Sequence, residues 1–317
     1  PFIRGPHRSV PMEDLVAEAA SLAAHGVREL ILIAQDTTWY GLDLYCRRAL
    51  GELLERLSAV PGIAWIRIHY SYPADFPEDV LQIMANNPKV CRYLDIPLQH
   101  ISDRMLDRMH RHVDGAWTRE LIARLRAEVP GVALRTTLIV GHPGESEEDF
   151  RELLDFVREA RFERLGAFTY SEEEGTWGAK HLRDDVPEGV KAERLDRLME
   201  LQRGISLACN QSRVGSVLPV LVDELLPLSS VSAGQEEPEW VFRQTCPENN
   251  SGPRLPKTSV PISAICRSEF ESPEVDGEIL VRGVPEGVKV GDFIRVRIVE
   301  ADDYDLIADF LSIFVAD

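Results

Sequence analysis

The stretch LRTTLIVGHPGESEEDF, residues 134–150, gives the clearest indication of the fold. It begins as an apolar run rich in β-branched residues, which is typical of a buried strand. The run ends at Gly141-His142-Pro143-Gly144, and Ser146 with three acidic residues then starts an amphipathic helix. Such a turn lets a ligand approach bare backbone beside unpaired helix N–H groups, although an ordinary strand-to-helix turn has the same pattern.

The same alternation of strand and helix extends through the first two thirds of the chain. Helical patterns occupy 11–25, 49–60, a short segment after Pro77, two stretches before 132, 146–160 and about 186–212. Strand-like apolar runs occupy 29–38, 64–73, 91–100, 132–140 and a segment that starts at 164. Strands that alternate with helices predict an α/β fold with a parallel sheet or barrel.

Polar or small residues stand at the end of every predicted strand. In parallel barrels the active site is built at the carboxyl ends of the strands, so these residues are candidates for a site. The alternative is that polar residues only mark where strands leave for loops. The strand ends are Gln35-Asp36-Thr37-Thr38, His69-Tyr70-Ser71, Gln99-His100, Gly141-His142 and Tyr170-Ser171-Glu172.

The chain changes character after the long helix, which divides it into predicted domains at 1–212 and 213–317. The second part has short β-rich runs at 217–225, 274–283 and 292–302, separated by Gly, Pro and Asp. Runs of this length predict a small antiparallel β-barrel. Residues 229–261 are rich in Pro, Ser and Gln, so we expect a mobile insertion there.

Charge and cysteine content limit the possible functions. The 317 residues carry a net charge of −18, and the second domain has 9 basic against 19 acidic side chains. This balance argues against direct nucleic-acid binding and fits a basic protein partner. The five cysteines are scattered without Cys-x-x-Cys spacing, which predicts a reducing, cytoplasmic location and no metal site within this chain. No apolar run is long enough to span a membrane.

Four motifs together resemble the radical S-adenosylmethionine (SAM) methylthiotransferases. They are AQDTTWYGLDLY (34–45), DIPLQHISD (95–103), LRTTLIVGHPGESEEDF (134–150) and GAFTYSEEEGT (166–176). The resemblance covers 1–212, and 213–317 looks like the TRAM domain that these enzymes append. It implies a partial (β/α)6 barrel of the TIM-like radical SAM type, of which 1–212 would hold strands two to six.

Within this family the chain is most similar to the branch that adds a methylthio group to the β-carbon of an aspartate in a small-subunit ribosomal protein. Sister branches modify adenosines in transfer RNA and differ at 35–37 and 173–176. A third alternative is an inactive binding module. The resemblance implies SAM, two 4Fe-4S clusters and an electron donor. It places a cysteine loop just before Pro1, so the cluster ligands are expected outside this chain, which would be the carboxyl-terminal part of such an enzyme.

The resemblance also implies which residues contact the cofactor. The glycine-rich turn would lie against the adenine and methionine portions, because backbone can approach a flat ring only where side chains are small. The candidates in the turn are Gly141, Pro143, Gly144 and Glu145.

Other cofactor contacts are expected at neighbouring strand ends. Gln99 and His100 are candidates for hydrogen bonds to the ribose, although His100 could instead cap a loop. Arg135 is a candidate to pair with the carboxylate of the cofactor or with the substrate, or it could be an outward surface charge. The mouth of the same site would be lined by Gln35, Asp36 and Thr37.

Overall fold

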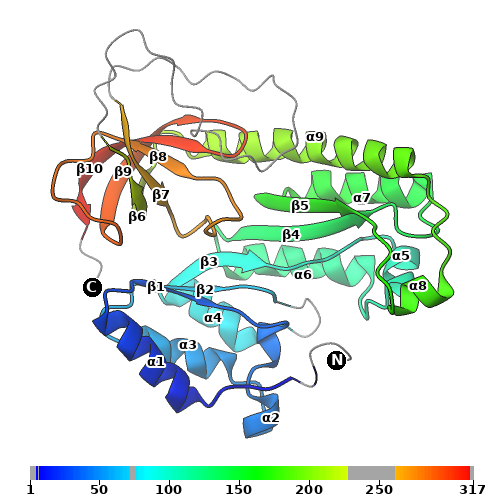
Figure 1. Cartoon of the computed structure of the whole chain (residues 1–317), viewed down its shortest axis with the longest axis horizontal. Coiled ribbons are helices and arrows are strands. Elements are labelled where there is room, and N and C mark those ends of the chain that lie inside the picture. Colours follow the sequence, from blue (N-terminus) through cyan, green and yellow to red (C-terminus); the bar gives the residue numbers. More distant parts are fainter. Residues whose placement is uncertain (1–4, 6, 72–75, 228–260, 315–317) are drawn as a thin grey trace.

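The computed structural model describes residues 5, 7–71, 76–227 and 261–314. Figure 1 shows a parallel sheet covered by helices, and a small barrel that packs against the sheet. The long helix α9 (Glu188–Ser212) runs beside the sheet and ends at the barrel. The predicted insertion at 229–261 falls outside the described residues except for its last position.

The sheet confirms the predicted parallel arrangement. Its five strands lie in chain order and every neighbouring pair is parallel. The first strand ends at Leu32, well before the predicted position 38, and Thr37–Trp39 form a short 3-10 helix, η1. The strands are β1 (Glu29–Leu32), β2 (Trp65–Ile68), β3 (Val90–Asp95), β4 (Ala133–Val140) and β5 (Arg164–Thr169).

Helices cover one face of the sheet and enclose the main apolar core. Ser146 begins α7 with a capping box, since its hydroxyl accepts from Asp149 N while Asp149 accepts from Ser146 N at 2.8 Å. The apolar stripe of α7 then buries Phe150, Leu153, Leu154 and Val157 at helical spacing. The helices before α9 are α1 (Met12–Ala24), α2 (Leu42–Tyr45), α3 (Leu50–Ser58), α4 (Glu78–Asn86), α5 (Asp103–Arg108), α6 (Gly115–Glu128), α7 (Glu147–Ala160) and α8 (Trp177–His181).

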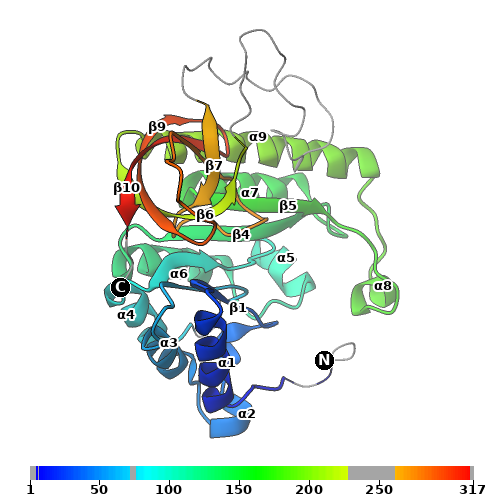
Figure 2. The same cartoon turned by 60° about the vertical axis from the view of Figure 1, so that its left-hand side comes forward.

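The carboxyl-terminal part forms a closed barrel of five strands, which Figure 2 shows as a ring. Its strands are β6 (Val217–Leu225), β7 (Ile262–Arg267), β8 (Ile279–Arg282), β9 (Phe293–Ala301) and β10 (Leu306–Phe314). The expectation of a purely antiparallel barrel is wrong at one contact, because β8 and β10 are parallel. The reason is topological: β9 crosses to pair with β6 and β10, so β10 returns beside β8 in the same direction.

The barrel packs against the face of the sheet that carries no helices, which we call the open face. The side chains of Arg67, Tyr93, Arg135 and Phe168 point to this side, whereas their chain neighbours enter the helix-covered core. Trp65 of the sheet meets Phe293 of the barrel edge-to-face, with ring centroids 4.7 Å apart. Among the described residues, no helix is both long and apolar enough to cross a membrane.

Acidic residues between β7 and β8 complete this contact. We call Ser268–Asp276 the docking segment. Its Glu271 is almost fully buried and pairs with Arg164 at 3.1 Å and with Arg213. Its Glu269 pairs with Arg92 at 2.8 Å. The docking segment therefore joins the barrel to the sheet by charge as well as by apolar packing.

Candidate functional site

A buried carboxylate holds the glycine-rich turn after β4. Glu145 Oε2 accepts hydrogen bonds from Gly141 N at 2.7 Å and His142 N at 3.3 Å. Its Oε1 accepts from Arg194 Nη1 of α9 at 3.0 Å. Desolvation outweighs these donors and raises the pKa of Glu145 to about 7. The turn is thus fixed from behind by α9 through Glu145.

His100 lies beside this carboxylate and is fully buried. Its Nδ1 accepts from Ser102 N at 3.0 Å, which places the proton of a neutral ring on Nε2. Burial lowers the pKa of His100 to about 3, so the ring is neutral near pH 7. Its contacts are those of a loop cap, and no ligand can reach it in this arrangement; the ribose contact stays a prediction.

Gly141 and Gly144 are required by the protein's own packing. Both have positive φ, 73° and 80°, which favours glycine. A Cβ on Gly141 would overlap the stem of Lys191, and one on Gly144 would lie 3.0 Å from Arg108 Cζ. Lys191 therefore occupies the space that a Cβ at Gly141 would need, and contact of this glycine with a flat ring stays a prediction.

The outer side of the turn is held by two arginines from α5 and one aspartate. Arg104 Nη2 donates to Gly144 O at 2.7 Å, and Arg108 Nε donates to Pro143 O at 3.0 Å. Gly144 N donates to Asp185 Oδ1 at 2.6 Å. Most polar backbone groups of the turn are therefore engaged within the protein, and Pro143 contributes through its carbonyl.

Four cations around the turn were missed by the sequence analysis. Arg104 and Arg108 are four residues apart on α5, and Lys191 and Arg194 are three apart on α9, so each pair shares a helix face. Lys191 and Arg194 are buried, at 1% and 5% exposure. The signal available in the sequence was the spacing of three or four residues between basic side chains, which stands out in a strongly acidic chain.

Gln99 lies between strand ends with its side chain half-buried. Its backbone has φ of 72° and bridges β4, since Gln99 N donates to Thr137 O at 2.9 Å and Gln99 O accepts from Ile139 N at 2.8 Å. This bridge places Gln99 against the carboxyl half of β4, and its contact with a ligand stays a prediction.

The loop after β1 contributes one exposed candidate and two anchored ones. Gln35 is exposed. Asp36 caps η1 by accepting from Thr38 N at 3.0 Å and Thr38 Oγ1 at 2.6 Å. Thr37 is buried and donates to His69 O at 3.1 Å, which ties the end of β1 to the end of β2. Of these candidates Gln35 is the most accessible to a ligand.

Arg135 lies on the open face beside the docking segment. Its Nη1 donates to Asp95 Oδ1 at 2.8 Å, and its Nε is 3.7 Å from Asp276 Oδ1. The side chain is 17% exposed, so the alternative of an outward surface charge is wrong. The structure separates Arg135 from the turn, because six strand positions along β4 span roughly 20 Å.

An apolar surface is uncovered at the carboxyl half of the open face. Phe168 of β5 is 62% exposed and pairs in register with Ile139 of β4, and Ile33, just after β1, is 66% exposed. Ile33 and Phe168 belong to opposite edges of the sheet, so the side-by-side apolar pair on this face is Ile139 and Phe168. With Gln99, whose backbone carbonyl accepts from Ile139 N, this pair forms the accessible part of the candidate site.

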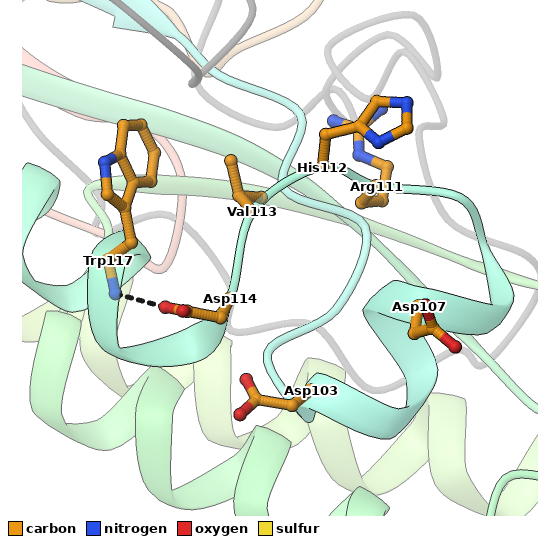
Figure 3. A pocket seen from close by; sticks show the side chains of 7 residues that line it. All are labelled: Asp103, Asp107, Arg111, His112, Val113, Asp114 and Trp117. Atoms are coloured by element: carbon orange, nitrogen blue, oxygen red, sulfur yellow. Dashed lines mark hydrogen bonds between the residues drawn. The ribbon is translucent and has the colours of Figure 1, made fainter.

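Figure 3 shows a separate cavity of about 670 Å³ on the helical side, between α5 and α6. Asp114 caps α6 there, since its Oδ1 accepts from Trp117 N at 2.7 Å. The cavity contains no predicted site residue. It is lined by Asp103, Asp107, Arg111, His112, Val113, Asp114 and Trp117.

The predicted residues His100, Gly141 and Glu145 do lie together, but they form a buried cluster and do not line this cavity.

The cysteines within the described residues do not approach one another as a ligand set. Cys91 and Cys266 are buried, Cys209 is half-buried and Cys46 is exposed. No group of three or more potential metal ligands occurs among the described side chains.

Comparison with known proteins agrees with this architecture. The radical SAM superfamily matches residues 2–157, and the TRAM domain family matches 259–311. The parallel sheet with its glycine-rich turn and the appended barrel thus define a radical SAM protein with a TRAM domain. Within that superfamily, the curated relatives that match this chain over nearly its whole length are methylthiotransferases.

Three curated relatives show the level of similarity. Each is named ribosomal protein uS12 methylthiotransferase RimO. The protein from Phocaeicola vulgatus is 46% identical over 98% of this chain and 64% of its own length. Those from Porphyromonas gingivalis (ATCC 33277) and Christiangramia forsetii are 49% and 47% identical, over 97% and 99% of this chain and 63% and 62% of their own lengths. This chain spans somewhat less than two thirds of the relatives it matches.

A solved structure, the Escherichia coli coproporphyrinogen III oxidase HemN, described as a radical SAM enzyme, matches with a TM-score of 0.46 at 19% identity. The match covers 61% of this chain and 46% of that chain, and the family assignment does not depend on it.

Proposed function

We propose that the protein containing this chain is a radical SAM methylthiotransferase that acts on the β-carbon of an aspartate in the ribosomal protein uS12. The observation that supports it most is the identity of 44–49% to curated enzymes of that name across 97–99% of this chain. A cytoplasmic location follows from the proposed substrate.

SAM and two 4Fe-4S clusters are the cofactors of the proposed enzyme. We place the adenosyl group against Ile139 and Phe168, which are neighbours on the open face, with the amide of Gln99 at its edge for polar contacts. SAM held at a cluster would supply radical chemistry at the target carbon, with the electron coming from a separate donor. The described residues supply no grouped cluster ligands.

The buried cluster has a supporting role in this proposal. Glu145 and Arg194 fix the backbone of the turn, and Lys191 fills the space behind Gly141. A turn that is held before the ligand arrives loses little entropy on binding. The buried cluster therefore contributes to ligand binding by fixing the shape of the turn. His100 and Glu145 themselves are buried and do not face the ligand.

The acidic composition of the barrel is weaker support for a basic protein partner than the sequence suggests, because some of the acids are engaged within the protein. Glu271 and Asp276 are used in contacts with the sheet, and Asp305 accepts from Glu278 N at 2.8 Å within the barrel. Exposed acids such as Glu274 and Glu286 still favour approach of a basic protein and oppose nucleic acid. The transfer-RNA branch and an inactive binding module are the competing functions.

The test uses the longer protein that contains this chain, reconstituted anaerobically with iron and sulfide. It is incubated with SAM and a reductant, and with either uS12 or unmodified transfer RNA. Mass spectrometry should find one methylthio group on an aspartate of uS12 and none on transfer RNA. Modification of transfer RNA alone would establish the sister branch, and a protein that binds uS12 without modifying it would be a binding module.

A further inference from the structure

The arginines of the open face are not equally satisfied. Arg67 has no exposed side-chain surface; its Nε is 3.0 Å from Glu29 Oε1, and its Nη1 donates to Glu269 O at 2.8 Å. Arg164 is 8% exposed and pairs with Glu271 at 3.1 Å. Arg135 is 17% exposed, more than either of the others, and lies level with Arg164 on the neighbouring strand. It is therefore the arginine of these three that a ligand on the open face can reach.

One edge of the Arg135 guanidinium has room for a ligand. Nη1 serves Asp95 and, at 3.4 Å, Thr137 Oγ1, whereas Nη2 makes no hydrogen bond to any described residue. The neighbouring residue on β5 is Gly166, where an added Cβ would lie 3.6 Å from Nη2. Because glycine has no side chain, no Cβ occupies the space beside Nη2 on the side of β5.

The docking segment holds the other edge of Arg135. Asp276 Oδ1 is 3.7 Å from Arg135 Nε, and Asp276 Oδ2 accepts from Tyr93 OH at 2.7 Å and from Ser272 N at 2.9 Å. Asp276 is therefore fixed by two donors and directs Arg135 without saturating it. Burial raises the pKa of Asp276 above the usual value for an aspartate.

We propose that Arg135 receives the carboxylate of the target aspartate through its Nη2 edge, with Asp276 of the barrel as a positioning residue. This rests on the proposed function and adds the residue that recognises the target side chain. A guanidinium binds a planar carboxylate through parallel N–H donors, and it does not offer the same charge-assisted contact to an amide.

The test compares binding of uS12 with that of uS12 carrying Asn at the target position, using the reconstituted longer protein. The wild type should bind the Asp form about tenfold more tightly, as expected for a charge-assisted hydrogen bond. Arg135→Gln should bind both forms equally, and Arg135→Lys should retain part of the preference. Asp276→Asn should reduce the preference while Arg135 is intact. Arg124→Gln, at a residue 44% exposed on α6, is the control and should leave the preference unchanged.

The ratio of the two affinities is the decisive quantity, because a general loss of stability lowers both affinities together. Equal affinity of the wild type for the two forms, no binding of either form, or an unchanged ratio in Arg135→Gln would each overturn the assignment. The proposed function fails separately, when the wild-type enzyme leaves uS12 unmodified. A preference for the Asp form that persists in that case would still support Arg135 as the carboxylate receptor.

Discussion

His100 Nε2 lies 3.9 Å from Glu145 Oε2, and both side chains are fully buried. The distance is too long for a hydrogen bond, and Nε2 has no other partner among the described residues. An unsatisfied buried donor of this kind costs about 1 to 3 kcal/mol. The pair therefore lies where the chain leaves β3 and β4, and it lowers the free energy of unfolding. The contributions of its two members to that free energy should change with pH in opposite directions.

Replacing His100 with Asn should make unfolding less sensitive to acid. The pKa of His100 is about 3 in the folded protein and 6.5 when unfolded, so the unfolded chain binds the proton first. The stabilising contribution of the neutral His100 ring is therefore fully present above pH 6.5 and is lost as the pH falls toward 3. Between about pH 7 and about pH 5 the wild type should lose about 2 kcal/mol more than His100→Asn in urea titrations. Parallel pH profiles of the two proteins would refute this.

Glu145→Gln should show the opposite trend. The pKa of Glu145 is about 7 when folded and 4.5 when unfolded, so the folded state holds the proton longer. The wild type should lose stability relative to Glu145→Gln as pH rises from 4.5 to 7, by about 2 to 3 kcal/mol. Urea midpoints across that range measure the difference. A wild type that gains stability relative to the variant over this range would show that Glu145 is ionised throughout.

Gly141→Ala should destabilise the protein more than Gly131→Ala does. Both glycines have positive φ, 73° and 78°, so both variants carry the same backbone strain of about 1 to 2 kcal/mol. Only Gly141 has Lys191 in the space that a Cβ needs, whereas nothing lies within 4 Å at Gly131. The overlap should add about 1 to 3 kcal/mol. Thermal melts of both variants decide it, and Lys191→Ala should relieve Gly141→Ala if the overlap is the cause.

Glu271→Gln should weaken the contact between sheet and barrel. Burial acts to raise the pKa of Glu271, but Arg213 and Arg164 outweigh it and lower the pKa to about 2. Removing this carboxylate leaves two arginines without their partner and should cost about 3 kcal/mol at neutral pH. The carboxylate's contribution is present above 4.5 and is lost as pH falls toward 2.

Glu269→Gln is the matched control for the docking segment. Its partner Arg92 is 42% exposed, so this ion pair is screened by solvent and its loss should cost about 1 kcal/mol or less. Limited proteolysis alongside urea unfolding would show whether sheet and barrel separate. Equal effects of the two substitutions would mean that burial of Glu271 does not govern the contact.

Periodicity and turn residues were sufficient to predict the parallel sheet, because apolar runs and helix caps are local signals. The capping box at Ser146 and the apolar stripe of α7 follow directly from residues 146–160. Strand lengths were overestimated because residues such as Gln35 and Thr37 are compatible with both strand and loop, and contacts to β2 decide between them.

The interior of the candidate site depends on contacts that are distant in sequence. Lys191 fills the space behind Gly141 from fifty residues further along the chain, and nothing near Gly141 indicates it. The acids of the docking segment look like surface charge in the sequence, since composition shows charge but not burial. Glu271 and Asp276 are instead buried against arginines of the sheet.

Closure of the barrel by the parallel β8–β10 pair has a consequence for amide hydrogen exchange. Every strand of the ring is hydrogen-bonded on both sides, whereas β1 and β5 each have one neighbour within the described sheet. A barrel amide can therefore exchange with deuterium only after a ladder on either side has opened, which makes exchange across the ring cooperative. In the sheet, deuterium should enter first along β1 and β5 and reach β3 last, so the sheet and the barrel exchange their amide protons by different routes.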